Sequence, residues 1–148
     1  MVAVFEKSGF RFMYPENWEI FDEQLTQEPS TVSLQSPGSG FWSLATYPES
    51  STPADLAAEA LQAMQTQYSE LEFESLPDES WIAEEALGYE LNFFCLDMVV
   101  TARILAFRSQ KQSLLVHWQA EVQEFEQAEG VFRAITLSLV RPPQETAD

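Results

Sequence analysis

The first third of the chain alternates between apolar and polar positions, which is typical of β-strands. Short runs of this kind occupy residues 2–6, 10–14, 18–25, 31–36 and 41–47. The stretch YPENW breaks the alternation at Pro15, because proline cannot donate to a strand ladder and favours an extended residue before it. We therefore expect a corner at this point, with Trp18 starting the next strand and closing one end of the core.

Two segments replace this alternation with a repeat of three to four residues, which predicts amphipathic helices. The first covers residues 52–69, where Thr52 can act as the N-cap and Pro53 suits the first helical position. The second covers residues 122–139 and contains Gly130, which costs about 1 kcal/mol in helix propensity relative to alanine. We expect this glycine to serve close packing or to allow a kink.

Further strands are expected between the two helices. Residues 71–75 alternate strictly and carry glutamates on one side, as an edge strand or a strand with one face in water does. Residues 98–109 are apolar on both faces, which predicts a central strand. Asp97 separates this strand from the one at 88–96, which predicts a hairpin, and residues 113–121 form the last strand.

Runs of strands separated by single helices favour the α+β class over a βαβ architecture. The PGSG sequence at 37–40 predicts a hairpin turn inside the first run. We expect a single α+β domain over residues 1–140, with a mainly antiparallel sheet of six to seven strands flanked by two main helices. Residues 141–148 are polar and contain two prolines, so we expect a flexible C-terminal tail there.

The charge of the chain changes the functional picture. The sequence has a formal net charge of -17 and a pI near 4.1, and it has no Lys or Arg between Arg11 and Arg103. Such a surface repels nucleic-acid backbones and anionic lipid headgroups. It favours a basic or apolar protein partner, if the charge serves a partner at all. Because no signal sequence and no membrane-length apolar run is evident, we expect a cytoplasmic protein without membrane insertion.

Candidate chemistry is sparse, because the sequence has one His and one Cys. Alternation places His117 on the strand face of Leu115 and Gln119, and Cys95 in a buried pattern. A Cys–His pair across neighbouring strands would be a nucleophile arrangement, although we expect a buried thiol and a structural histidine instead. The acidic clusters lack the spacing of a Ca²⁺ loop, and no phosphate-binding or hydrolase motif is present. We therefore expect no catalytic, cofactor or metal site, and a protein that is not an enzyme.

Aromatic residues beside predicted turns are the remaining candidates for contact with a partner. Trp42 follows the PGSG turn, and Trp81 follows PDES and precedes the acidic pair Glu84 and Glu85. An aromatic side chain at such a place can anchor a partner, or it can fold back onto the core. These four residues are therefore the expected partner-binding positions.

The order of elements and several stretches of sequence resemble the PsbP-like family. The stretches are FRFMYPENWE at 10–19, VSLQSPGSGFWSLATY at 32–47, the helix from Pro53, and LLVHWQAEVQEFEQAEGVFRAITLSL at 114–139. That family includes the photosystem II extrinsic protein, a nuclear import factor that binds the GTPase Ran, and bacterial DcrB-like domains. The resemblance implies an antiparallel sheet with helices on both faces, and a protein that binds other proteins, mostly without catalysis.

Three functions stay open at this point. The first is a non-enzymatic protein-binding or adaptor module with a strongly acidic surface. The second is a protein similar to the Eag-type chaperones, which would shield an apolar helix of a secreted client and would have an apolar groove on the sheet and form a homodimer. The third is a small-ligand-binding protein or enzyme with a pocket near Cys95 and His117.

Overall fold

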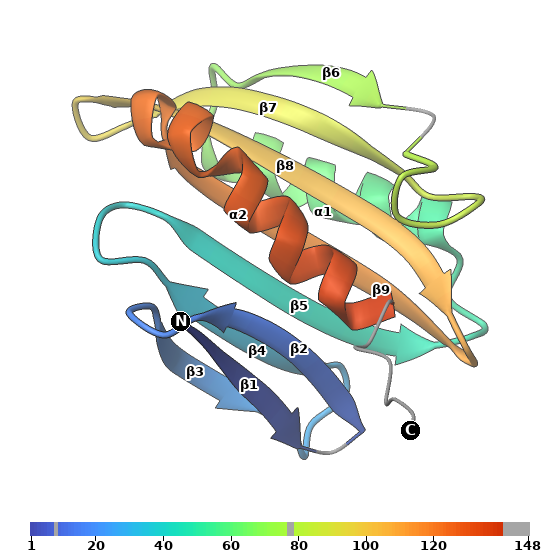
Figure 1. The fold of residues 1–148 in the computed structure, drawn as a ribbon. Coiled ribbons are helices and arrows are strands. Elements are labelled where there is room, and N and C mark those ends of the chain that lie inside the picture. The colour runs from blue at the N-terminus through green and yellow to red at the C-terminus, as the bar shows by residue number, and fades with distance from the viewer. Residues whose placement is uncertain (8, 77–78, 141–148) are drawn as a thin grey trace.

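The computed structural model describes residues 1–7, 9–76 and 79–140 of the chain, so the expected tail at 141–148 lies outside the described residues. Its centre is a seven-stranded antiparallel sheet in the order β3-β4-β5-β9-β8-β7-β6 (Figure 1). The strands are β3 (Glu19–Gln24), β4 (Ser30–Gln35), β5 (Phe41–Pro48), β6 (Glu72–Leu76), β7 (Leu87–Cys95), β8 (Met98–Ser109) and β9 (Gln112–Glu121). The expected α+β class and strand number are thus confirmed.

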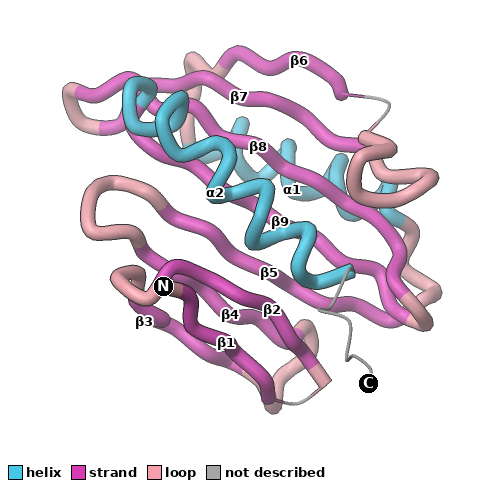
Figure 2. Tube along the Cα trace, in the orientation of Figure 1, coloured by secondary structure: helices cyan, strands magenta, loops and turns pink. Residues whose placement is uncertain are grey.

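The two helices lie on opposite faces of this sheet (Figures 1 and 2). Helix α1 (Pro53–Gln67) packs on β7, β8 and β9, and helix α2 (Val122–Val140) crosses β8 and β9 on the other side. Strands β1 (Val2–Lys7) and β2 (Phe10–Pro15) form a separate two-stranded sheet that packs beside α2. The sequence predicted these two strands but not that they leave the main sheet.

The larger core fills the layer between the sheet, α2 and the β1–β2 hairpin. Trp42 is fully buried there, and the ring of Phe12 packs on it with 4.9 Å between ring centroids. The Trp42 indole N–H donates to Thr136 Oγ1 at 3.0 Å, so this buried polar group is satisfied. These contacts explain why the hairpin lies on the sheet: the apolar side of β1 and β2 covers the tryptophan of β5.

The corner at YPENW forms as expected. β2 ends at Pro15, and the Trp18 backbone N–H donates to the Pro15 carbonyl at 3.0 Å. Trp18 is buried and meets the ring of Phe132 edge-on, with 5.6 Å between centroids. This stretch therefore serves the fold, since its tryptophan joins the N-terminal strands to α2.

Helix α1 covers part of the opposite face. Thr52 Oγ1 accepts a hydrogen bond from the Asp55 backbone N–H at 3.2 Å, which confirms Thr52 as the N-cap. Leu56, Ala57 and Leu61 are the buried residues of its apolar stripe. None of the helices in the described part of the chain is long and apolar enough to cross a membrane.

The predicted PGSG turn joins β4 to β5, and the first turn of α2 holds it in place. Glu124 accepts hydrogen bonds from the Ser39 backbone N–H at 2.7 Å, the Ser39 hydroxyl at 2.7 Å and the Ser36 hydroxyl at 2.9 Å. A Cβ atom added at Gly38 would lie 2.6 Å from the Glu124 carboxylate, so a side chain there would displace the carboxylate from its present position. Burial alone would raise the pKa of Glu124, but these hydrogen bonds outweigh it and hold the pKa below its ordinary value.

Candidate functional site

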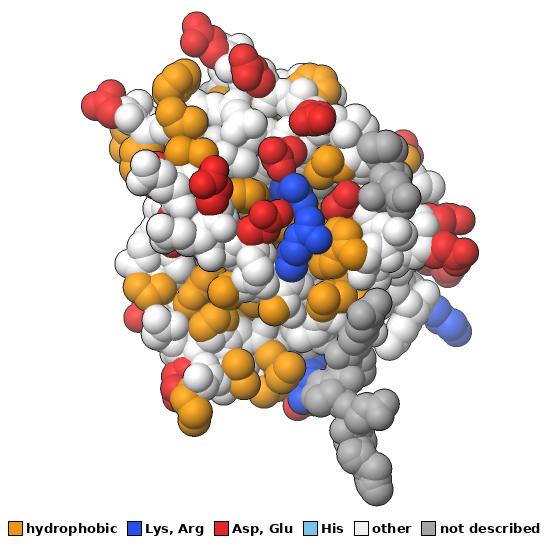
Figure 3. Space-filling model, turned by 45° about the horizontal axis from the view of Figure 1, so that its top comes forward, with side chains coloured by type: hydrophobic (Ala, Val, Ile, Leu, Met, Phe, Trp, Pro, Cys, Tyr) orange, Lys and Arg blue, Asp and Glu red, His pale blue; other side chains and the backbone are white. Residues whose placement is uncertain are grey.

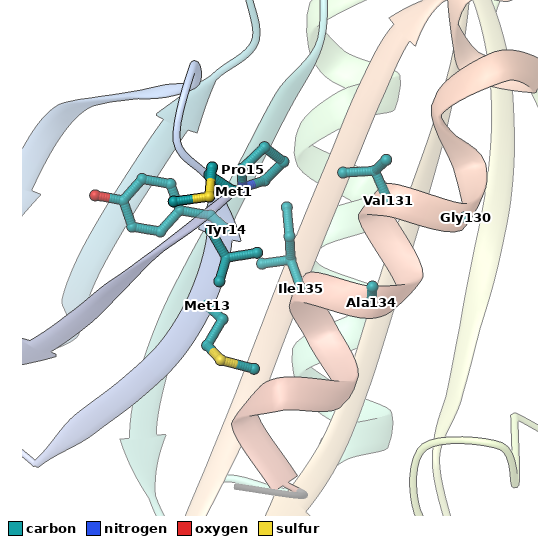
Figure 4. A pocket seen from close by; sticks show the side chains of 9 residues that line it. Met1, Met13, Tyr14, Pro15, Gly130, Val131, Ala134 and Ile135 are labelled. Atoms are coloured by element: carbon teal, nitrogen blue, oxygen red, sulfur yellow. The ribbon is translucent and has the colours of Figure 1, made fainter. Parts of the chain in front are cut away.

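An apolar groove lies between the end of β2 and the middle of α2 (Figure 4). Its volume is about 340 Å³. The side chains that line it come from the N-terminal hairpin on one side and the helix on the other: Met1, Val2, Met13, Tyr14, Pro15, Gly130, Val131, Ala134 and Ile135. Met1 and Val2 are exposed at its rim, so the groove has an apolar margin as well as an apolar floor.

Gly130 borders the groove and contributes no side chain to it. A Cβ atom added at Gly130 would meet nothing within 4 Å, and α2 continues unbroken through this residue. The expectation that Gly130 allows close packing is therefore wrong. Its absent side chain leaves open space at the groove, at the cost of about 1 kcal/mol in helix propensity.

The strand side of the groove is set by Pro15. The backbone N–H of Met13 points toward α2 and donates to Ser138 Oγ at 2.8 Å, which ties strand to helix. Backbone N–H groups on one edge of a strand recur at every second residue, so the next one toward the groove would belong to Pro15. Proline has no N–H. No such bond can form there, and the groove lies at this end of β2.

The basic side chains Arg103 and Arg133 interact with acidic or aromatic side chains of the protein itself. Figure 3 shows Lys and Arg side chains near the centre of one face, with Asp and Glu side chains around them. Arg103 Nε and Nη2 donate to Glu90 Oε1 at 3.1 and 2.9 Å, and Nη2 also lies 3.5 Å from Glu129 Oε2. Arg133 lies over the Trp81 ring, 4.6 Å from its centroid. These internal pairs leave the acidic excess of the chain to dominate its surface.

The structure places the two candidate tryptophans differently. Trp42 is fully buried, so the prediction of a partner-binding anchor at this residue is wrong. Its position beside a turn gave no information on burial, because the covering layer comes from β2 and α2. Trp81 is half-buried, donates from its indole N–H to Glu79 Oε1 at 2.9 Å and carries Arg133 on one face. A partner-binding role for Trp81 stays a prediction.

Glu84 and Glu85 are exposed beside a small hollow on the β6–β7 connection. The hollow has a volume of about 190 Å³ and is also lined by Pro53, Ala83 and Arg108. The two carboxylates do not border the apolar groove described above. Their role in binding a partner likewise stays a prediction.

Cys95 and His117 are not brought together. Cys95 pairs with Met98 at the end of the β7–β8 hairpin, whereas His117 pairs with Ile104. Met98 and Ile104 are separated along β8 by about 20 Å, at roughly 3.3 Å per residue. The hypothesis of one pocket shared by Cys95 and His117 is therefore wrong.

His117 has a structural environment. Its Nε2 atom shares a 2.8 Å hydrogen bond with Gln119 Oε1, and its ring meets Phe41 edge-on at 5.8 Å. Burial lowers the pKa of His117, and the hydrogen bond to Gln119 opposes this shift in part. Within the described residues, no three His, Cys, Asp or Glu side chains are grouped so that they could hold a metal ion.

Comparison with known proteins identifies the architecture. No protein-family model matches the chain, and no curated protein matches it in sequence. Among solved structures, the Pseudomonas aeruginosa protein of unknown function PA94 is similar over 98% of this chain and 99% of its own, with 13% identity and a TM-score of 0.57. The cyanobacterial PsbP (CyanoP) of Synechocystis sp. PCC 6803 covers 91% of this chain and 88% of its own, with 11% identity and a TM-score of 0.55.

The chain has a PsbP-like fold. At 11% and 13% identity these likenesses concern the fold alone, because one fold hosts many functions. The PsbP-like resemblance read from the sequence is thus supported at the level of architecture. The residues of the groove, in contrast, were not foreseen. The one signal in the sequence was Gly130, a helix-weakening residue inside an otherwise regular apolar repeat.

Proposed function

We propose that this protein is a non-enzymatic binding module of the PsbP-like family, and that it holds an apolar segment of a basic protein partner in the groove between β2 and α2. The observation that carries this proposal is the open apolar groove itself. A volume of about 340 Å³ falls within the range of about 300–1,000 Å³ that is usual for binding sites. It is large enough to take a few aliphatic side chains from a partner.

The lining of the groove fits a protein segment whose residues vary in shape. Met1 and Met13 line it, and methionine side chains adapt to irregular apolar surfaces. Polar groups that would orient one small molecule are few, since the lining side chains are apolar apart from the hydroxyl of Tyr14. The net charge of -17 favours basic residues on either side of the bound segment and speeds their association at low salt.

Gly130→Leu is the variant that tests this function. The new side chain has open space to occupy and removes the helix-propensity cost of glycine, so we expect unfolding stability to be unchanged or higher by up to about 1 kcal/mol. It also fills the groove. The probe is a fluorescein-labelled peptide with leucines on one helical face and lysines on the other, and binding is followed by fluorescence anisotropy.

We expect the wild-type protein to bind this peptide and Gly130→Leu to bind it at least about tenfold more weakly, a difference of ~1.4 kcal/mol. The matched control is Gln123→Leu, which adds the same side chain at an exposed position of α2 about 10 Å from Gly130 along the helix axis. Equal affinity of wild type and Gly130→Leu would contradict the proposal. So would undiminished binding of a peptide with glutamate in place of lysine.

An Eag-type chaperone is the second candidate, and the apolar lining of the groove is the observation that favours it. Such a chaperone would bind a client helix and form a homodimer. The groove differs from the one expected for this function, because it lies between the hairpin and α2 rather than on the main sheet. Sedimentation equilibrium distinguishes the two candidates: a dimer supports the chaperone, and a monomer that still binds the peptide supports the adaptor module.

A further inference from the structure

The β7–β8 hairpin ends in a group of exposed apolar side chains, just beyond the buried Phe93 and Val100. Phe94 is 63% exposed, Leu96 90%, Met98 41% and Val99 40%. We call these four residues the apolar tip. Leu96 is at its apex, in the two-residue turn that joins Cys95 to Met98. Burying such side chains is the main favourable term in folding, yet here they face solvent.

Leu96 also has a backbone conformation that disfavours it. Its φ angle is +59°, and a left-handed conformation costs a residue with a Cβ atom on the order of 1 kcal/mol. Two-residue hairpin turns need a positive φ at this position, which is why glycine and asparagine are preferred there. The β8–β9 turn meets the same need with Gln110, at a φ of +58°. Turn geometry therefore explains the strain but gives no reason for an exposed leucine.

The backbone of the tip continues directly from strands that are packed and paired. Phe93 is buried and stacks on Tyr68 with 4.2 Å between ring centroids, and Cys95 packs into the same cluster. Strands β7 and β8 stay in register as far as the Cys95–Met98 pair. A backbone fixed by packed strands loses little conformational entropy when it binds, which favours a role in recognition.

Several carboxylates lie close to the tip. Asp97 lies in the turn itself, Glu70 borders a hollow together with Phe94, and Glu121 pairs with Val100 on the neighbouring strand. The sequence has no Lys or Arg between Arg11 and Arg103, so neither β7 nor the turn itself carries a positive charge. This combination favours a complementary surface that is apolar at its centre and basic at its rim.

We propose that the apolar tip is a second docking site, in which Leu96 and Phe94 insert into an apolar pocket of a partner protein whose rim carries Lys or Arg. A second copy of this chain is a poor occupant, because its own acidic tip and net charge of -17 repel the first. An anionic membrane surface is disfavoured for the same reason. The tip does not border the groove, so this proposal stands apart from the proposed function.

Photo-crosslinking from the tip tests the proposal in cells that produce the protein. The photoreactive residue p-benzoyl-phenylalanine replaces Leu96 in one variant and Gln110 in the matched control, which has the same φ at the apex of the other hairpin. Mass spectrometry then locates the adduct. We expect one dominant protein adduct from position 96, within an apolar pocket bordered by Lys or Arg, and no such adduct from position 110.

Capture of a protein does not by itself support the proposal, so the charge is tested as well. Adding Asp97→Lys to the crosslinking variant reverses the charge in the turn, and we expect the adduct yield to fall by about tenfold, as for a charge reversal at a complementary interface. An unchanged yield would overturn the proposal. The absence of an adduct, the same adduct from position 110, an adduct with the chain itself or an adduct with lipid would overturn it too. A thermal melt of each variant confirms that it is folded.

Discussion

Strand β8 has a two-residue turn at each end, and the two turns share a backbone geometry but differ in side-chain chemistry. The turn before it carries Leu96 and Asp97, and the turn after it carries Gln110 and Lys111. Both have a positive φ at the first position, +59° and +58°. At the β8–β9 turn the exposed side chains are polar and the apolar ones are buried further along the strand. At the β7–β8 turn the apolar side chains continue to the apex. Folding accounts for the first arrangement and leaves the second unexplained, which is why we assign the apolar tip to binding.

The largest expected effect is a difference in unfolding free energy between two truncated phenylalanines, one buried and one exposed, on the two hairpins. Phe107 lies near the β8–β9 turn and is fully buried, so we expect Phe107→Ala to lower the free energy of unfolding by about 3–5 kcal/mol. Its matched control is Phe94→Ala at the tip, where we expect a change within about 0.5 kcal/mol. Urea denaturation at neutral pH measures both. Similar losses of unfolding free energy in the two variants would contradict the difference between the hairpins.

The PGSG turn differs from the apolar tip, because its side-chain hydrogen bonds to Glu124 stabilise the fold. Glu124 has a lowered pKa in the folded protein, so its ionised form stabilises the fold at pH values above the ordinary glutamate pKa. That contribution disappears as the pH falls through the lowered folded value. We expect Glu124→Gln to cost about 1–2 kcal/mol at pH 7, reduced by the partial exposure of the carboxylate, and to cost progressively less on acidification.

Thermal or urea unfolding of Glu124→Gln across a pH series provides this measurement. Glu126→Gln is the control, since it removes the same charge from an exposed position of α2. A difference between wild type and Glu124→Gln that grows as the pH falls would show that the hydrogen bonds from Ser39 and Ser36 do not favour the ionised form.

A smaller effect tests whether the two turns carry the same backbone strain. Asparagine tolerates a left-handed conformation better than leucine or glutamine, so Leu96→Asn and Gln110→Asn should each stabilise the protein by up to about 1 kcal/mol. We expect the two gains to agree within about 0.5 kcal/mol. A gain at one turn alone, in parallel urea titrations, would show that the turns differ in their backbone and not only in their side chains.

The local elements could be predicted well from the sequence, whereas the burial of their side chains could not. The cap at Thr52, the corner at Pro15 and the alternation around His117 depend on near neighbours in the chain, and all three follow from the pattern. Trp42 shows the limit: alternation tells which residues share a strand face, but the cover on that face comes from residues on β2 and α2. The groove and the apolar tip were missed for the same reason, since exposure depends on segments distant in sequence.

The free energy of unfolding of Leu96→Gln tests most directly whether the tip serves folding or binding. This change gives the β7–β8 turn the same apex residue as the β8–β9 turn, at nearly the same φ. Because Leu96 is 90% exposed, we expect the variant to match the wild-type value within about 0.5 kcal/mol in urea titrations. A loss of more than about 1 kcal/mol would place Leu96 among the residues that stabilise the fold, and would remove the reason for assigning the tip to a partner.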